Sequence, residues 1–325
     1  MLILTRTDVE RVLTMSMAIE GCRRAYVAVS QKQATVPERH AVHVPECDGD
    51  MLVMSGYLPG FPSLGLKVVS TFTGNRQFNL PSTQGAIILL DPRTGTPEVL
   101  MDGSLITAVR TGAGSGMATA LLAREDADSV AILGTGGMAW DQYQAMRTVR
   151  PVRRAYVWNR TRERAVEFAD RLARAHPEVA VEVTDTPDDA VAHSLLVCAA
   201  TASPEPVVHG AVLQQGAHVN LTGAHRPEWR EIDSAGVLRA QVRSVDSLTS
   251  GVRPGDYSMP IHAGEIRLEQ IEEIGAIATD PGKGRRSADA ITLFKSVGLA
   301  AQDLAVAVQV REAARAAGLG IEVDL

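Results

Sequence analysis

The apolar positions of the chain change their spacing near residue 36. Between residues 7 and 31 they recur every three or four positions, which predicts helix, with Asp8 as its cap. Between residues 36 and 100, short apolar runs such as LGLKVVSTFTG and TQGAIILLD are separated by Pro and Gly, which predicts strands. The segment ILLDPRTGTPEVL places Asp-Pro and Thr-Gly between two apolar runs and predicts a hairpin. With a helix expected over residues 104–123, this first block is predicted to be α+β and antiparallel.

From residue 129 the pattern alternates between strand and helix. SVAILG, RAYVWN and VAVEV are typical of strands, whereas AWDQYQAMRTV and RERAVEFADRLARA have helical spacing. This βαβαβ order predicts a doubly wound parallel sheet with right-handed crossovers. The tail over residues 290–317 is predicted to be helical and to return to the first block. We expect one domain over residues 1–122 with the return 298–325, and an α/β domain over residues 123–297.

The composition is that of a globular protein and excludes several functional classes. The chain has 325 residues, 45% of them hydrophobic, which is enough for about two domains. Its net charge is 32 − 38 = −6, so it lacks the cationic excess that nucleic-acid binding requires. The three cysteines form no C-x-x-C pair, which favours a reducing, cytoplasmic setting. Since no signal-peptide pattern and no apolar run of about 18 residues is present, we expect no membrane partner.

The sequence VAILGTGGMA carries the clearest motif. It is a G-x-G-x-x-A pattern directly after an apolar strand and directly before a helix. Gly134 permits the tight turn, and Gly136 lets the backbone approach a pyrophosphate. The helix start at Gly137 and Met138 offers unpaired N–H groups to phosphates. This context predicts a Rossmann-type dinucleotide site.

The end of the next strand indicates which dinucleotide is bound. NAD sites usually place Asp or Glu there to accept a hydrogen bond from the ribose 2′-hydroxyl. This chain has Asn159, Arg160 and Thr161 instead. A guanidinium pairs with a 2′-phosphate, which a carboxylate would repel. We therefore expect NADP(H) to be preferred, with NAD(H) as the alternative.

Three isolated cations of the first block are candidates for binding an anion. Arg39 lies in VPERHAVH, Lys67 lies inside the apolar run LGLKVVS, and Arg110 ends SLITAVR. A strand cation that faces the interior needs an anion, and a small-molecule carboxylate is the natural candidate. The nearby pair His40 and His43 has no third ligand, so we expect no metal site.

Several stretches resemble the ornithine cyclodeaminase and mu-crystallin family. They are LKVVSTF, LPSTQGAIILLD, DGSLITAVRTGA, ILGTGGMA, VWNRTRERAVEFAD, NLTGAHRPEWREID and TLFKSVGLAAQDL. The resemblance implies a homodimer whose first block forms the dimer and binds a small imino or amino acid. It also implies that Arg39, Lys67 and Arg110 bind the substrate carboxylate. The cofactor-binding residues that we expect are Thr83, Arg110, Gly134, Gly136, Gly137, Met138, Asn159, Arg160, Thr161, Thr201, Thr222 and Val297.

One segment departs from the cyclodeaminase pattern. In GAHRPEWRE, His225 stands where ornithine cyclodeaminases carry a catalytic Asp, and Trp229 stands where they carry a Lys. The segment is more similar to the mu-crystallin subgroup, which is associated with NADPH-dependent ketimine reduction. The resemblance thus implies reduction of an α-imino acid, such as pyrroline-2-carboxylate or piperideine-2-carboxylate. Lys67 or His225 would supply the proton, and the pKa of an ordinary histidine, about 6.5, suits that role.

Other functions remain open at this point. One is a different enzyme on the same scaffold: an ornithine or lysine cyclodeaminase, or an amino acid dehydrogenase similar to alanine dehydrogenase or iminosuccinate reductase. Another is a non-catalytic small-molecule binder gated by NADPH. Three carboxylate-binding cations favour turnover, because a binder of apolar ligands would not need them.

Overall fold

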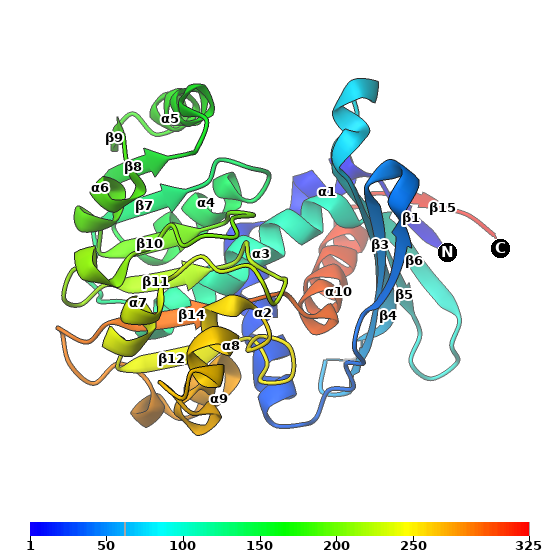
Figure 1. Ribbon diagram of the computed structural model, residues 1–325. Helices are drawn as coiled ribbons and strands as arrows, with labels where there is room; N and C mark the ends of the chain where they lie inside the picture. The colour runs from blue at the N-terminus through cyan, green and yellow to red at the C-terminus, as the bar shows by residue number, and fades with distance from the viewer. Residues whose placement is uncertain (62, 325) are drawn as a thin grey trace. The chain divides into compact units, whose positions relative to one another are not determined.

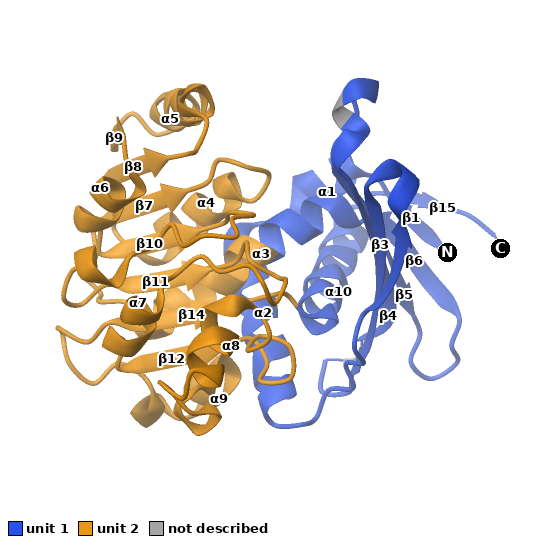
Figure 2. Cartoon of the chain, viewed as in Figure 1, with its two compact units in different colours: residues 1–110, 299–325 blue, residues 111–298 orange. Residues whose placement is uncertain are grey.

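The chain forms two compact units. The computed structural model describes residues 1–61 and 63–324. Unit 1 comprises residues 1–110 and 299–325, and unit 2 comprises residues 111–298 (Figure 2). The chain therefore passes from unit 1 to unit 2 within helix α3 (Gly103–Leu122). The boundaries expected from the sequence, after residues 122 and 297, stay predictions.

Unit 1 is built on a seven-stranded sheet in the order β15-β1-β6-β5-β4-β3-β2 (Figure 1). β1 runs parallel to β6, and the other neighbours are antiparallel. The predicted hairpin is confirmed as β5 and β6. The strands are β1 (Leu2–Leu4), β2 (His40–Val44), β3 (Gly49–Leu58), β4 (Ser63–Phe72), β5 (Thr83–Leu90), β6 (Pro97–Asp102) and β15 (Ile321–Glu322).

The predicted N-terminal helix is divided into α1 (Arg6–Val12) and α2 (Met15–Ser30). The expectation that Asp8 caps it was wrong. Thr5 is the N-cap of α1, and Asp8 lies three residues later, where its carboxylate accepts from the Thr5 N–H at 2.9 Å. The two side chains form a capping box. Thr14 is the N-cap of α2, where its hydroxyl oxygen accepts from the Met17 N–H.

One face of the unit 1 sheet is covered by helix α10 (Ala300–Ala316). Two glycines allow this close approach. A Cβ on Gly56 would lie 3.3 Å from a Leu304 methyl carbon, and one on Gly65 would lie 3.1 Å from another. Lys67 points to this covered face, since it stands opposite Met54 and is itself buried. The register therefore places a charged side chain beneath a helix.

Unit 2 contains an eight-stranded sheet in which every pair is parallel, with the order β13-β12-β14-β11-β10-β7-β8-β9. The predicted doubly wound fold is confirmed. The strands are β7 (Ser129–Leu133), β8 (Arg154–Trp158), β9 (Ala180–Val183), β10 (Leu196–Ala199), β11 (His218–Leu221), β12 (Val242–Val245), β13 (Glu272–Glu273) and β14 (Thr292–Lys295). The remaining helices are α4 (Ala139–Val149), α5 (Arg162–Ala175), α6 (Pro187–Ala192), α7 (Ser234–Arg239), α8 (Gly255–His262) and α9 (Ile274–Thr279).

The prediction of helix from residue 290 was wrong for its first ten residues. Residues 292–295 form β14, which lies between β11 and β12 and is buried on both faces. A short apolar run cannot be assigned to strand or helix by periodicity alone. The helix begins only at Ala300. The glycine-rich run in α3 permits close packing, since a Cβ on Gly112 would lie 2.3 Å from the Asp141 carbonyl oxygen.

Over the part of the chain that the structure describes, no helix combines the length and the apolar character that a bilayer crossing needs.

Candidate active site

The glycine motif forms the turn between β7 and α4. Gly134 has a φ of +88°, which strongly favours glycine. At Gly136 and Gly137 a Cβ would meet nothing within 4 Å, so packing within this chain does not require glycine there. The backbone N–H groups of Gly136, Gly137 and Met138 donate to no partner among the described residues. This turn therefore presents open space and unpaired donors at a helix start, which is what a pyrophosphate needs.

Both ends of the Asn159 amide bind the backbone of this region. Its Oδ1 accepts from the Thr135 N–H at 3.2 Å, and its Nδ2 donates to the Thr161 carbonyl at 2.9 Å. The side chain thus connects the turn after β7 to the turn after β8. Arg160 is exposed and has no ion-pair partner within the described ranges. Arg162 is paired with Asp185. Arg160 is therefore the cation of this turn that is open to an added anion.

The two threonines expected to line the cofactor cleft, Thr201 and Thr222, donate their hydroxyl protons to other groups of unit 2. Thr201 donates from both its N–H and its hydroxyl to the Glu231 carboxylate, at 2.7 and 2.9 Å. Thr222 donates its hydroxyl to the Ala199 carbonyl at 3.1 Å and accepts from Gln142. Each hydroxyl oxygen can still accept a hydrogen bond. A ligand at this edge would consequently meet acceptors rather than donors at these positions.

Other expected residues are placed as follows. The Val297 N–H donates to Asp246 Oδ2 at 2.8 Å, just beyond β14. Thr83 begins β5, where its hydroxyl lies 3.5 Å from that of Thr71. His225 is exposed, with Nδ1 3.2 Å from the Gly223 carbonyl oxygen and its ring edge-on to Trp229. The roles expected for these residues stay predictions.

Arg39, Lys67 and Arg110 lie close together in unit 1, and a carboxylate that the sequence did not predict, Asp303, binds two of them. Asp303, on α10, is fully buried. Its Oδ1 accepts from Lys67 Nζ at 2.8 Å and from Arg110 Nε at 2.9 Å. Arg39 is close enough to lower the pKa of Lys67. Lys67 and Arg110 therefore already share an internal carboxylate, but one carboxylate does not neutralise both of these cations.

The surroundings of Lys67 bring its titration near neutral pH. Burial, followed by the charge of Arg110, lowers the pKa of Lys67 to about 8, while Asp303 opposes the shift. An amine with such a pKa is protonated at neutral pH and yet releases its proton readily. Lys67 is consequently equipped both to attract a carboxylate and to donate a proton.

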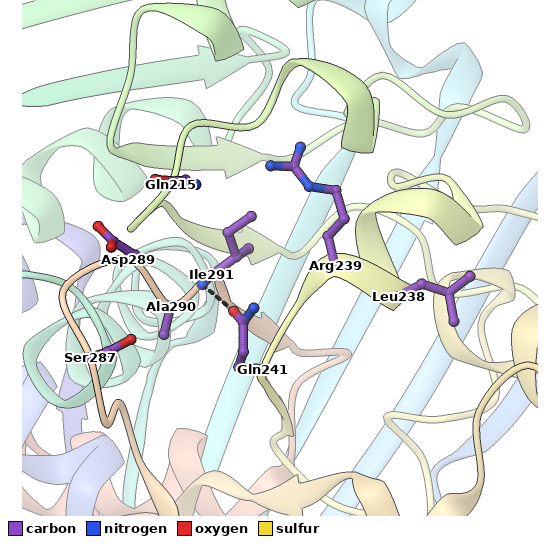
Figure 3. Close-up of a pocket in the computed structure, with 8 residues that line it drawn as sticks. All are labelled: Gln215, Leu238, Arg239, Gln241, Ser287, Asp289, Ala290 and Ile291. Atoms are coloured by element: carbon purple, nitrogen blue, oxygen red, sulfur yellow. Dashed lines mark hydrogen bonds between the residues drawn. The ribbon is translucent and has the colours of Figure 1, made fainter.

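Figure 3 shows a surface pocket of unit 2, whose lining includes Gln241 and Ile291. Gln241 and Ile291 directly precede β12 and β14, and the Ile291 N–H donates to Gln241 Oε1. These residues stand at the amino ends of parallel strands. Because ligands of doubly wound folds bind at the carboxyl ends, this pocket is separate from the candidate dinucleotide site.

Five buried charged residues of the described chain were not predicted from the sequence: Asp246, Asp256, Asp303, Glu231 and Lys295. A signal was available for Lys295, which stands in the apolar strand TLFK just as Lys67 stands in LGLKVVS. The acids gave no comparable signal, since their partners lie far away in sequence. Within the described ranges, no group of three or more His, Cys, Asp or Glu side chains is arranged to hold a metal.

A Rossmann-type unit with unpaired turn amides and a second unit with a buried cation cluster define a class of two-unit α/β proteins. The chain belongs to the ornithine cyclodeaminase/mu-crystallin family, which it matches over residues 1–318. It is 32% identical over 326 residues to the Δ1-pyrroline-2-carboxylate reductase of Bacillus cereus, covering 100% of both chains.

Two solved structures share this fold. The Δ1-pyrroline-2-carboxylate reductase of Thermococcus litoralis, in complex with NADH and L-proline, is similar with a TM-score of 0.94 and 36% identity. The similarity covers 99% of this chain and 100% of that one. An archaeal alanine dehydrogenase dimer with bound NAD has a TM-score of 0.90 and 29% identity, covering 99% of this chain and 98% of the other.

We predict that Asp303→Asn lowers the free energy of unfolding by about 3–5 kcal/mol, because it removes one partner of a buried charge cluster. Urea denaturation measures the change. Glu20→Gln is the matched control, since Glu20 pairs with Arg24 on the exposed surface of α2 and its loss should change stability by at most about 0.5 kcal/mol. Equal stabilities of the two variants would show that the buried cluster does not stabilise unit 1.

Proposed function

We propose that this protein reduces cyclic α-imino acids to α-amino acids by hydride transfer from NAD(P)H. The observation that carries the proposal is the excess positive charge around Lys67, which Asp303 only partly neutralises. A buried cation excess favours an anionic ligand, and a carboxylate forms charge-assisted hydrogen bonds with Lys and Arg. The open glycine turn of unit 2 fits the pyrophosphate of a dinucleotide.

The relatives support a cyclic imine as the substrate. The two named pyrroline-2-carboxylate reductases align with nearly the whole chain, and one of them was solved with NADH and L-proline. Proline is the product expected when the C=N bond of pyrroline-2-carboxylate takes up a hydride and a proton. Pyrroline-2-carboxylate and piperideine-2-carboxylate are therefore the leading substrates.

We propose a role in this reaction for each of the candidate site residues. Arg39, Lys67 and Arg110 hold the carboxylate, which fixes the neighbouring C=N bond for attack. When bound, NAD(P)H supplies the hydride to the imine carbon. The ring nitrogen needs one proton, and Lys67 would supply it; its burial and its contact with Asp303 support this role. His225 is the alternative donor. Asp303 keeps Lys67 protonated and oriented.

We predict NADPH oxidation with pyrroline-2-carboxylate or piperideine-2-carboxylate, at a rate that falls as the pH rises past about 8. The reason is that Lys67 loses its proton there. Absorbance at 340 nm measures turnover, and Lys67→Met should reduce kcat/KM by about 100-fold or more. If His225→Ala keeps the wild-type rate and the same fall past about pH 8, Lys67 remains the donor.

Other results of the same assay would contradict the proposal. Ammonia release from ornithine or lysine without NADPH consumption would indicate a cyclodeaminase. Dependence on added ammonia and a keto acid would indicate an amino acid dehydrogenase acting on acyclic imines. Tight NADPH binding without turnover of any imine would indicate a non-catalytic binder.

We further propose that NADP(H) is preferred over NAD(H). Asn159 carries no negative charge that would repel a 2′-phosphate, and its amide is bound to the Thr135 N–H and the Thr161 carbonyl. Arg160 follows directly and is exposed at the end of β8. A guanidinium there supports a 2′-phosphate. The relatives solved with NADH and NAD support nicotinamide dinucleotides in general.

We predict that Arg160→Ala lowers the ratio of kcat/KM for NADPH to kcat/KM for NADH by roughly 10- to 100-fold, the range expected for a charge-assisted contact with phosphate. The NADH value should hardly change. Arg174→Ala, at the exposed far end of α5, is the matched control and should leave the ratio as it is. The same ratio in wild type and Arg160→Ala would rule out this role.

We also propose that a second copy of the chain covers the open face of the unit 1 sheet. Ile3, Leu66, Ile88 and Leu100 stand side by side across four strands on the face opposite α10, and all are half-buried. A row of apolar residues of this kind favours association. The archaeal alanine dehydrogenase is a dimer, which supports the same assembly here.

The three cysteines, all free, are compatible with the cytoplasm.

We predict that Ile88→Lys converts a dimer into a monomer, because it places a charge in the middle of this apolar row. Analytical ultracentrifugation measures the mass, and circular dichroism checks that the chain is folded. Val166→Lys, an exposed apolar position on α5, should remain dimeric. A monomeric wild type, or a dimeric Ile88→Lys, would contradict the proposal.

A further inference from the structure

Three successive strand ends of unit 2 touch one another at the candidate dinucleotide site. A Cβ on Gly223, beyond β11, would lie 2.0 Å from the Thr201 carbonyl oxygen and 2.2 Å from the Thr201 nitrogen. A Cβ on Gly134, at the end of β7, would lie 2.9 Å from the Ala200 oxygen and from the Thr201 methyl carbon. The loop after β10 is therefore packed between the glycine turn and the loop after β11.

One buried carboxylate binds two of these loops at once. Oε1 of Glu231 accepts from the N–H and the hydroxyl of Thr201, at 2.7 and 2.9 Å. Oε2 accepts from the N–H groups of Gly223 and Ala224, at 2.7 and 3.2 Å. Glu231 is fully buried. Because all four contacts are donors, the ionised carboxylate fits this position and an apolar side chain would leave the donors unpaired.

Lys295 and Asp256 hold Glu231 in place. Lys295 Nζ lies 2.8 Å from Asp256 Oδ2 and 3.8 Å from Glu231 Oε2, and it donates to the Ala224 carbonyl at 2.6 Å. Asp256 Oδ1 accepts from the Glu231 N–H at 2.6 Å. The cluster therefore restrains Glu231 through its side chain and its backbone, and it also reaches the loop after β11.

Such a cluster is costly, because burying charges removes their hydration. Burial raises the pKa of Glu231 above its usual range, although Lys295 opposes the shift. What the cluster does provide is a set geometry for the strand ends that border the glycine turn.

We infer that Glu231 is a positioning residue for the dinucleotide, acting through Thr201 on the glycine turn. By fixing Thr201 against Gly134, it holds the amides of Gly136 and Gly137 toward the pyrophosphate. It also determines how Thr201 meets the cofactor, since both Thr201 donors are taken and only its oxygen can accept. This inference rests on the dinucleotide site of the proposed function and assigns residues that do not touch the dinucleotide.

The test is Glu231→Gln, which keeps the size of the side chain. In either amide orientation, its NH2 group faces two N–H or O–H donors, so one loop loses its acceptor. We expect the Kd for NADPH to rise about tenfold, measured by nicotinamide fluorescence, and the KM for NADPH to rise with it. The KM for the imine should stay within twofold.

The matched control is Arg285→Lys. Arg285 donates to the Leu122 and Gly216 carbonyls at 2.6 and 3.0 Å, near the amino ends of the strands. Its replacement should lower the melting temperature and leave the NADPH Kd unchanged. If Glu231→Gln also lowers only the melting temperature, with wild-type affinity for NADPH, the inference is overturned.

A second variant covers the case in which Glu231→Gln does not fold. Asp256→Asn keeps the oxygen that binds the Glu231 N–H but places an amide against Lys295. We expect a two- to fivefold rise in the NADPH Kd, and an unchanged Kd would overturn the inference. If the wild-type chain binds neither NADPH nor NADH, the proposed function fails and this inference fails with it. If the wild type binds and the variants match it, only this inference fails.

Discussion

Two buried carboxylates organise the chemistry of this protein, one in each compact unit. A carboxylate removed from water must be surrounded by donors or cations. Asp303 meets that requirement with groups from distant parts of the chain, and Glu231 meets it with the backbone of nearby loops and with Lys295. Asp303 joins a strand lysine to a helix arginine in unit 1. Glu231 joins the loops after two parallel strands in unit 2. Their positions restrain Lys67 and Arg110 in unit 1 and Thr201 in unit 2.

The consequence for unit 1 concerns charge. Without Asp303, Lys67 and Arg110 would be two cations buried together, and Lys67 would give up its proton more easily still. With Asp303, the lysine keeps a pKa of about 8, while the cluster retains a net positive charge for an added carboxylate. Under the proposed function, one internal anion would allow the same lysine to bind a substrate acid and to act as a proton donor.

The sequence predicted the features that depend on neighbours along the chain. The glycine turn was recognised because strand, glycines and helix are contiguous, and the hairpin of β5 and β6 because its turn residues lie between two apolar runs. Lys67 was predicted to bind an anion because its charge interrupts an apolar strand. The same reasoning applied to Lys295 would have found it as well. Strand β14 was not predicted because a run of four residues is too short to show the periodicity of either a strand or a helix.

What the sequence by itself determined is the class of fold, the location of the glycine turn and the identity of the cations, since these follow from local pattern and composition. Only the tertiary structure decided which anion faces them. Asp303, which binds Lys67, lies 236 residues from it along the chain. The partner of Thr201 was likewise decided by the tertiary structure, since Glu231 lies 30 residues from it. The physical reason is that a buried charge is satisfied through space, by whichever groups the packing of helices and strands brings within about 3 Å.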